Sequence, residues 1–179
     1  TYDALSINIG STPQLAQVAG ASEHAVPVKP IRRFNERWLA LLERVCQHPG
    51  ATTIALVGAG AGGVELTLAM QYRLRNELLV RGRNPDDLMF HLFSAGPQIL
   101  PTHNAKVRQA FADGLAERGV VVHLDAEVTQ VAANSLQTAS GEVLAADEIV
   151  WVTQAGGAPW LRETGLALDE KGFIRVHDT

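Results

Sequence analysis

Residues 53–63 read TIALVGAGAGG, and they are the most informative part of the sequence about the fold. Its first five residues form a continuous apolar run, which is typical of a central parallel strand covered on both faces. A glycine-rich turn follows, and a helical pattern then extends from Gly60 to about Leu79. A buried strand, a glycine turn and a helix in this order predict the first unit of a parallel α/β sheet.

The glycines of the turn are spaced as G-x-G-x-x-G. Gly58 allows the tight turn, Gly60 leaves the backbone open to a pyrophosphate, and Gly63 lets the helix pack closely on the strand. The helix start offers free backbone N–H groups and a partial positive charge to phosphates. The residues of this turn predicted to bind a cofactor are Gly58, Ala59, Gly60, Ala61, Gly62 and Gly63.

A glycine-rich turn has other uses, so two alternatives stay open at this point. The turn could hold no ligand, or it could hold S-adenosylmethionine in a methyltransferase. Its position directly after a buried strand and at the opening of a helix is the context that dinucleotide binding requires. That context favours a dinucleotide.

The elements outside this unit extend the same pattern. Strand-like segments are predicted at 2–9, 25–29, 88–93, 120–124, 148–152 and 173–176. Helices are predicted at 31–47 and 105–118, with a short helix near Leu161. Three short alternating pieces joined by polar turns are predicted at 127–131, 136–138 and 142–144. The order predicts an α/β fold: a Rossmann-like open parallel sheet with helices on both faces, in which an antiparallel β-meander replaces one crossover helix.

The second predicted strand ends at Ser94 and Ala95, where dinucleotide-binding folds usually carry an acidic residue for the adenosine ribose. A carboxylate there would repel a 2′-phosphate, by about 4 kcal/mol at a separation of ~4 Å, and an arginine would attract it. A serine does neither. We therefore expect Ser94 and Ala95 to line the site with modest discrimination between NAD and NADP, NAD being the default; the alternative is that Ser94 is only a loop residue.

Composition excludes several other classes. The net charge is −4 with no basic stripe, which argues against a nucleic-acid partner. The single cysteine, Cys46, cannot form an internal disulfide, a CxxC pair or a cysteine metal site. The six histidines show no metal-binding spacing and are interpreted as surface or loop residues, and no residue is assigned a catalytic role. A cytoplasmic location fits this composition.

Four stretches in the same order carry a family resemblance: YDALSINIGSTP at 2–13, VGAGAGGVEL at 57–66, FSAGPQILP at 93–101 and IVWVTQAGGAP at 149–159. The chain resembles the two-dinucleotide-binding-domain flavoproteins of the pyridine nucleotide-disulfide oxidoreductase superfamily. Within it, the chain is most similar to the type II NADH dehydrogenase-like branch, and then to the oxidoreductase found fused to, or encoded beside, selenide, water dikinase.

The resemblance implies two cofactors, FAD and NAD(P)H. It implies that residues 1–52 end an FAD-domain segment, 53–154 form the NAD(P)-binding domain and 155–179 return toward the FAD domain. Such a chain is expected to be a fragment with an incomplete FAD site, inactive by itself. The implied flavin-side residues are Gly10, Ser11 and Pro13, and those near the nicotinamide are Gln154, Ala155 and Gly156. Glu65, placed in the first turn of the glycine-turn helix, is either an acid favoured by the helix dipole or a polar contact near nicotinamide or flavin.

The function implied is hydride transfer from NAD(P)H to FAD and on to a quinone-like or protein acceptor, since no CxxC pair is present to take the electrons. The alternative is a nucleotide-sensing or docking module without turnover. The expected partners are the nicotinamide dinucleotide and FAD held by parent-protein segments. Further candidates are a peripheral contact at the inner face of the membrane, a selenium-metabolism partner and a homodimer.

Overall fold

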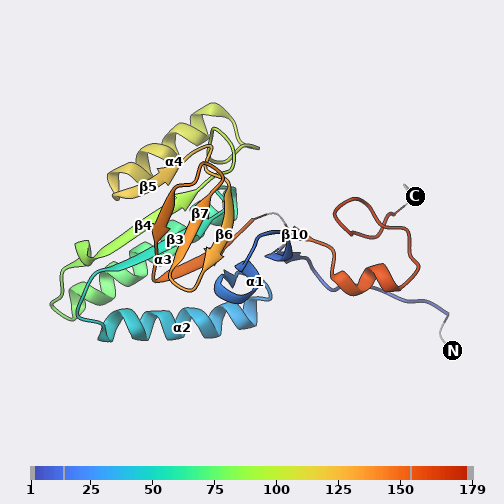
Figure 1. The fold of residues 1–179 in the computed structure, drawn as a ribbon, viewed down its shortest axis with the longest axis horizontal. Coiled ribbons are helices and arrows are strands. Elements are labelled where there is room, and N and C mark those ends of the chain that lie inside the picture. The colour runs from blue at the N-terminus through green and yellow to red at the C-terminus, as the bar shows by residue number, and fades with distance from the viewer. Residues whose placement is uncertain (1–2, 14, 154, 177–179) are drawn as a thin grey trace.

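A computed structural model describes residues 3–13, 15–153 and 155–176. Its centre is a sheet of five parallel strands in the order β2-β9-β3-β4-β5 (Figure 1). The strands are β2 (Val26–Pro27), β3 (Thr52–Val57), β4 (Leu88–Phe93), β5 (Val120–His123) and β9 (Glu148–Trp151). Strand β3 is the middle strand, and its apolar run is almost fully buried, as the sequence predicted.

Three long helices cover one face of this sheet. They are α2 (Ile31–Gln47), α3 (Ala61–Val80) and α4 (Ala105–Glu117). Helix α2 contributes Leu41 and Val45 to the core, with Phe34, Trp38 and Leu42 packed against it. These five residues are the apolar face that the helical spacing of residues 31–47 requires, and the predicted bounds of α2 are confirmed.

The other face is covered mainly by a separate antiparallel sheet. It consists of β6 (Val128–Ala132), β7 (Ser135–Thr138) and β8 (Val143–Ala145), with the short helix α1 (Ala21–His24) beside it. This meander connects β5 to β9 in place of a crossover helix (Figure 1). The predicted fold class is confirmed, although on this second face the helical contribution is a single turn.

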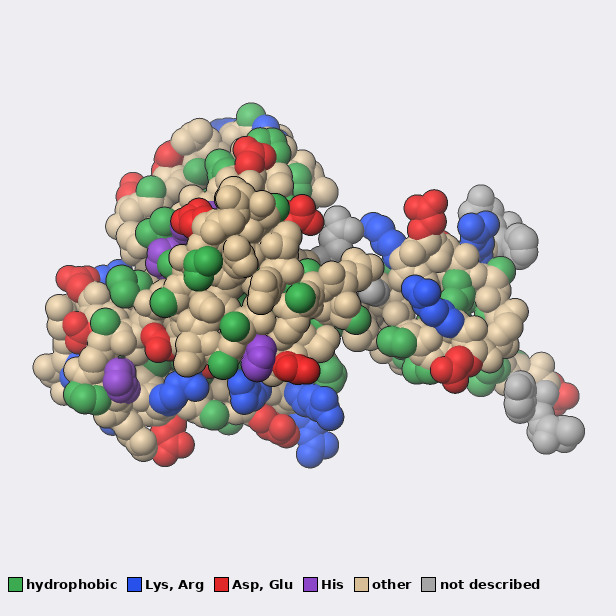
Figure 2. All heavy atoms as spheres, viewed as in Figure 1, with side chains coloured by type: hydrophobic (Ala, Val, Ile, Leu, Met, Phe, Trp, Pro, Cys, Tyr) green, Lys and Arg blue, Asp and Glu red, His purple; other side chains and the backbone are tan. Residues whose placement is uncertain are grey.

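A segment near each end of the chain contributes one strand to a two-stranded ribbon. Strand β1 (Thr12–Pro13) pairs antiparallel with β10 (Ala155–Gly156). Short 3-10 turns complete the elements: η1 (Leu15–Gln17), η2 (Pro85–Asp87) and η3 (Pro159–Glu163). Figure 2 shows a large body with a smaller lobe beside it, and Figure 1 places the five-stranded sheet and the three-stranded sheet in the large body.

Two predicted strands are wrong. Residues 3–9 of the first run are exposed, and they pair with no strand among the described residues. Within 173–176 only an isolated bridge forms, between Leu168 and Ile174. Alternation of apolar residues indicates which face of a strand would be buried, but a strand also needs a hydrogen-bonding neighbour.

A buried carboxylate fastens α2 to the sheet. The side chain of Glu148 on β9 is 6% exposed and forms ion pairs with Arg44 and, at 3.8 Å, with Arg37. Partnering by two arginines offsets the cost of removing this charge from water. Among the described helices, none combines the length and the apolar character needed to cross a membrane.

Candidate functional site

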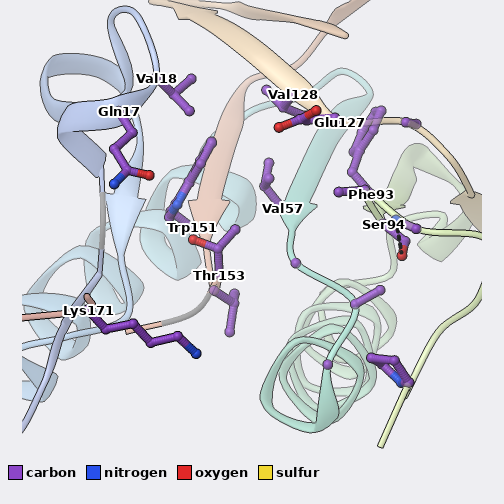
Figure 3. A pocket seen from close by; sticks show the side chains of 18 of the residues that line it. Gln17, Val18, Val57, Phe93, Ser94, Glu127, Val128, Trp151, Thr153 and Lys171 are labelled. Carbon is purple, nitrogen blue, oxygen red and sulfur yellow. Dashed lines mark hydrogen bonds between the residues drawn. The ribbon is translucent and has the colours of Figure 1, made fainter. Parts of the chain in front are cut away.

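A cleft of about 670 Å³ opens at the carboxyl ends of β3, β4 and β9 (Figure 3). In the sheet, β4 lies on one side of β3 and β9 lies on the other. The cleft is therefore at the switch point of the strand order, where open α/β sheets bind ligands. The cleft is lined by Gln17, Val18, Val57, Gly58, Ala59, Gly60, Phe93, Ser94, Ala95, Gly96, Pro101, Ala126, Glu127, Val128, Trp151, Val152, Thr153, Arg162, Glu170 and Lys171.

The glycine turn between β3 and α3 forms the floor of the cleft. Gly58 has a φ of 115°, a conformation that side chains disfavour. A Cβ atom on Gly63 would lie 1.7 Å from the carbonyl oxygen of Gly58, so only glycine allows the helix this close to the turn. A Cβ on Gly60 would meet nothing within 4 Å, so this backbone faces open space. The geometry agrees with the separate roles expected of the three glycines.

The start of α3 leaves backbone amides free. The first helical hydrogen bond runs from the amide of Val64 to the carbonyl of Gly60, at 3.0 Å. The amides of residues 61–63 therefore have no acceptor within the helix, and the N-cap residue, Gly60, has no side chain to supply one. An anion with several oxygens at this end of the cleft would satisfy them and would also interact favourably with the helix dipole.

The hydroxyl of Ser94 is already used by its own loop. Ser94 Oγ donates to the carbonyl of Gln98 at 3.1 Å, and the amide of Gly96 approaches Ser94 Oγ at 3.4 Å. Ser94 and Ala95 line the cleft as expected. Ser94 is 6% exposed, and its hydroxyl bonds hold the loop from Ser94 to Gln98 together.

Glu65 does not lie where the sequence placed it. Helix α3 begins at Ala61, so Glu65 is its fifth residue and the first turn contains no acid. The prediction started the helix at Gly60, which is instead the extended N-cap. Glu65 is exposed and does not line the cleft.

Residues that the resemblance implies near the two ends of the chain come together at the β1–β10 ribbon, and Pro13 and Gly156 are not among the residues that line the cleft. Pairing of β1 with β10 sets Thr12 opposite Gly156 and Pro13 opposite Ala155. Just before β1, Gly10 has a φ of 68°. Ser11 Oγ accepts a hydrogen bond from Lys29 Nζ at 2.6 Å. Gln154 lies outside the described residues.

Sequence reasoning missed the second wall of the cleft. This wall comes from η1, the β5–β6 connection, the end of β9 and the return segment, and it supplies Gln17, Val18, Glu127, Val128, Thr153, Arg162, Glu170 and Lys171. Apart from Thr153, which lies in the stretch 149–159, these residues belong to no local motif, and only the strand order brings them to the glycine turn.

Trp151, the last residue of β9, is 3% exposed. It also lines the cleft, and its indole N–H is the one buried side-chain polar atom without a hydrogen-bond partner among the described residues. A buried donor without a partner costs about 1–3 kcal/mol. An open glycine turn, free amides and an unpaired donor at one cleft together fit a polar, phosphate-bearing ligand.

The assignment of all histidines to surface or loop positions is wrong for two of them. His91 on β4 and His123 on β5 are partly buried, and their ring nitrogens Nδ1 and Nε2 lie 2.9 Å apart. The ring of His123 also stacks on Phe93, a cleft residue, with ring centroids 4.2 Å apart. The two strands lie side by side in the sheet, which the spacing of 32 residues along the chain does not reveal.

This pair predicts a pH dependence of stability. Burial, and then the neighbouring His123, lower the pKa of His91 below its ordinary 6.5, and Glu142 opposes the shift. As pH falls, His91 binds its proton in the unfolded chain at a higher pH than it does in the folded chain. The stability that the neutral His91 contributes is therefore present above about pH 6.5, and it is lost as pH falls through the lowered pKa. In urea unfolding, we expect wild type to lose more stability between about pH 7.5 and about pH 5 than His91→Gln does. His48→Gln, at an exposed position, is the control; equal losses in wild type and His91→Gln would contradict the prediction.

The fold is a Rossmann-like α/β unit with its cleft at the switch point of the sheet. The chain belongs to the pyridine nucleotide-disulphide oxidoreductase family, whose sequence profile matches residues 1–179. The type II NADH:quinone oxidoreductase of Haemophilus influenzae is 28% identical over 202 residues, covering 99% of this chain and 45% of that protein. The NADH dehydrogenase-like protein YutJ of Bacillus subtilis is 25% identical, covering 97% of this chain and 44% of that protein.

A solved structure agrees with the fold. The structure of NDH2 from Plasmodium falciparum in complex with NADH matches 87% of this chain and 35% of that chain, with a TM-score of 0.74 at 18% identity. The resemblance to the type II NADH dehydrogenase-like branch is thus confirmed. The chain spans less than half the length of the curated relatives it matches here.

Proposed function

We propose that this chain is the NAD(P)H-binding portion of a flavin-dependent oxidoreductase, which passes hydride from NAD(P)H to FAD and on to a quinone-like or protein acceptor. The observation that carries the proposal is the open glycine turn at the cleft, with the free amides of residues 61–63 beside it. Family membership supports the redox class, and the names of relatives such as the Haemophilus influenzae enzyme support NADH and quinone as substrates.

The proposed role of this chain is to position the nucleotide. The turn at Gly58 to Gly63 would hold the diphosphate, and the loop at Ser94 and Ala95 would hold the adenosine end. The nicotinamide end would then lie toward Thr153 and the β1–β10 ribbon. When both cofactors are bound, the hydride chemistry belongs to them, and the protein supplies binding and orientation.

The ribbon suggests how the flavin side would be built. Pro13 is paired with Ala155 because β1 pairs with β10, and Gly10 and Ser11 directly precede β1 in the chain. We propose that this ribbon faces FAD held largely by parent-protein segments. On this view residues 1–52 and 155–179 belong with the FAD domain and 53–154 form the NAD(P)-binding domain. A peripheral contact at the inner face of the membrane, a selenium-metabolism partner and a homodimer are further proposals that rest on the resemblance.

The test is flavin reduction in the protein at its full natural length. Mixed with NADH without oxygen, the protein should lose the absorbance of its oxidised flavin, and a quinone added afterwards should restore it. Binding of NADH without bleaching of the flavin would contradict the proposed enzyme and would favour a nucleotide-sensing module. Binding of S-adenosylmethionine without binding of NADH would point to a methyltransferase.

A further inference from the structure

The adenosine end of the cleft contains a carboxylate that the second strand does not supply. In dinucleotide-binding folds the acid that accepts from the ribose 2′-hydroxyl usually ends the second strand. Here that strand is β4, which ends at Ser94, and the serine hydroxyl is bonded to the loop carbonyl of Gln98. Glu127, on the connection after β5, lines the same cleft.

Backbone hydrogen bonds hold Glu127 beside this end of the cleft. The amide of Ala126 donates to the carbonyl of Ser94 at 2.8 Å, and the amide of Asp125 donates to the carbonyl of Gly96 at 3.0 Å. On its other side, Glu127 accepts a bond from the amide of Ala139 at 2.7 Å, which ties it to the meander. The Glu127 backbone is therefore fixed next to the β4 loop from both directions.

The charge of the cleft is divided between its two ends. From Phe93 through Val128, Glu127 is the one charged side chain among the described residues that line the cleft. The return segment lines the cleft with two cations, Arg162 and Lys171, and one carboxylate, Glu170. Figure 3 shows Lys171 across the cleft from Ser94 and Glu127, on the side of Gln17. The adenosine end is thus acidic.

We propose that Glu127 is the residue that selects NADH over NADPH, an inference that rests on the proposed function. Its carboxylate accepts from the ribose 2′-hydroxyl, in place of an acid at the end of β4. A 2′-phosphate brings about two negative charges toward the same carboxylate, with no lining cation at that end to neutralise them. From Ser94 alone we expected only modest discrimination between NAD and NADP. With Glu127 at the adenosine end, we expect a clear preference for NADH.

The test compares dissociation constants for NADH and NADPH, by fluorescence titration at low salt on the protein at its full natural length. Wild type should favour NADH by about tenfold or more. Glu127→Gln should shrink that ratio about tenfold, mainly through tighter NADPH binding. Glu127→Asp, which keeps the charge, should retain most of the preference. The wild-type ratio should also shrink as salt rises, since Glu127 is exposed.

Asp125→Asn is the matched control. Asp125 is an exposed acid two residues away that does not line the cleft, and its φ of 50° is one that asparagine tolerates. This variant should keep the wild-type ratio. An unchanged ratio in Glu127→Gln, or an equal change for both nucleotides, would overturn the inference while leaving the proposed function standing. Failure of wild type to bind either nucleotide would overturn both.

Discussion

Replacing Gly63 with alanine is expected to cost the protein about 3 kcal/mol of stability or more, because the added methyl group has no room. Its carbon would lie 1.7 Å from the carbonyl oxygen of Gly58 and 2.9 Å from the carbonyl carbon. Both atoms belong to the backbone, so no side chain can rotate away. The start of α3 must instead move off the end of β3, and the buried contacts of that helix with the sheet must move with it.

Urea unfolding of Gly63→Ala measures this cost, and Gly62→Ala is the matched control. Gly62 lies in the same helical turn, but a Cβ there would meet only Val152 Cγ1, at an ordinary 3.7 Å. Alanine also favours a helix over glycine by about 0.5–1 kcal/mol, so Gly62→Ala should be neutral or stabilising. Equal stability of the Gly62 and Gly63 variants would show that the turn does not pack as described.

Replacing Gly60 with valine should instead abolish nucleotide binding with little loss of fold. The φ of Gly60 is −73° and its Cβ would enter open space, so the folded protein can accept a side chain there. That space is where the diphosphate must approach the backbone. We expect NADH affinity to fall at least about 100-fold, equivalent to about 2.7 kcal/mol, while stability falls by no more than about 1 kcal/mol from the weaker N-cap.

The same substitution at Gly114, in the middle of α4, separates these effects. A Cβ at Gly114 also meets nothing within 4 Å, but the residue lies outside the cleft. Gly114→Val should therefore bind NADH as wild type does. If Gly60→Val binds NADH as tightly as wild type, the diphosphate does not lie against this turn.

Local sequence patterns predicted the part of the site that is formed by neighbouring residues in the chain. The run of residues 53–57, the glycine spacing and the amphipathic face of residues 31–47 are each set by near neighbours in the chain, so the strand, turn and helix were predictable. The buried run also required cover on both faces, and the helices and the meander provide it.

The other part depends on contacts between distant segments. Glu127 reaches the adenosine end only because β5 lies beside β4, and Lys171 reaches the cleft only because the return segment folds back toward it. The same reason explains the missed His91–His123 pair, which joins two adjacent strands. The strand predicted at 2–9 failed in the opposite way, since its alternation was present but no described segment pairs with it.

We propose that main-chain amides at the end of β3 bind the diphosphate of a nicotinamide dinucleotide. A crystal structure of the protein at its full natural length with NADH tests it most directly. We expect phosphate oxygens within about 2.7–3.2 Å of amide nitrogens at the start of α3, with the adenosine ribose on the side of Ser94 and Glu127. NADH bound elsewhere, with this turn filled by solvent or by a side chain of the protein, would contradict the account.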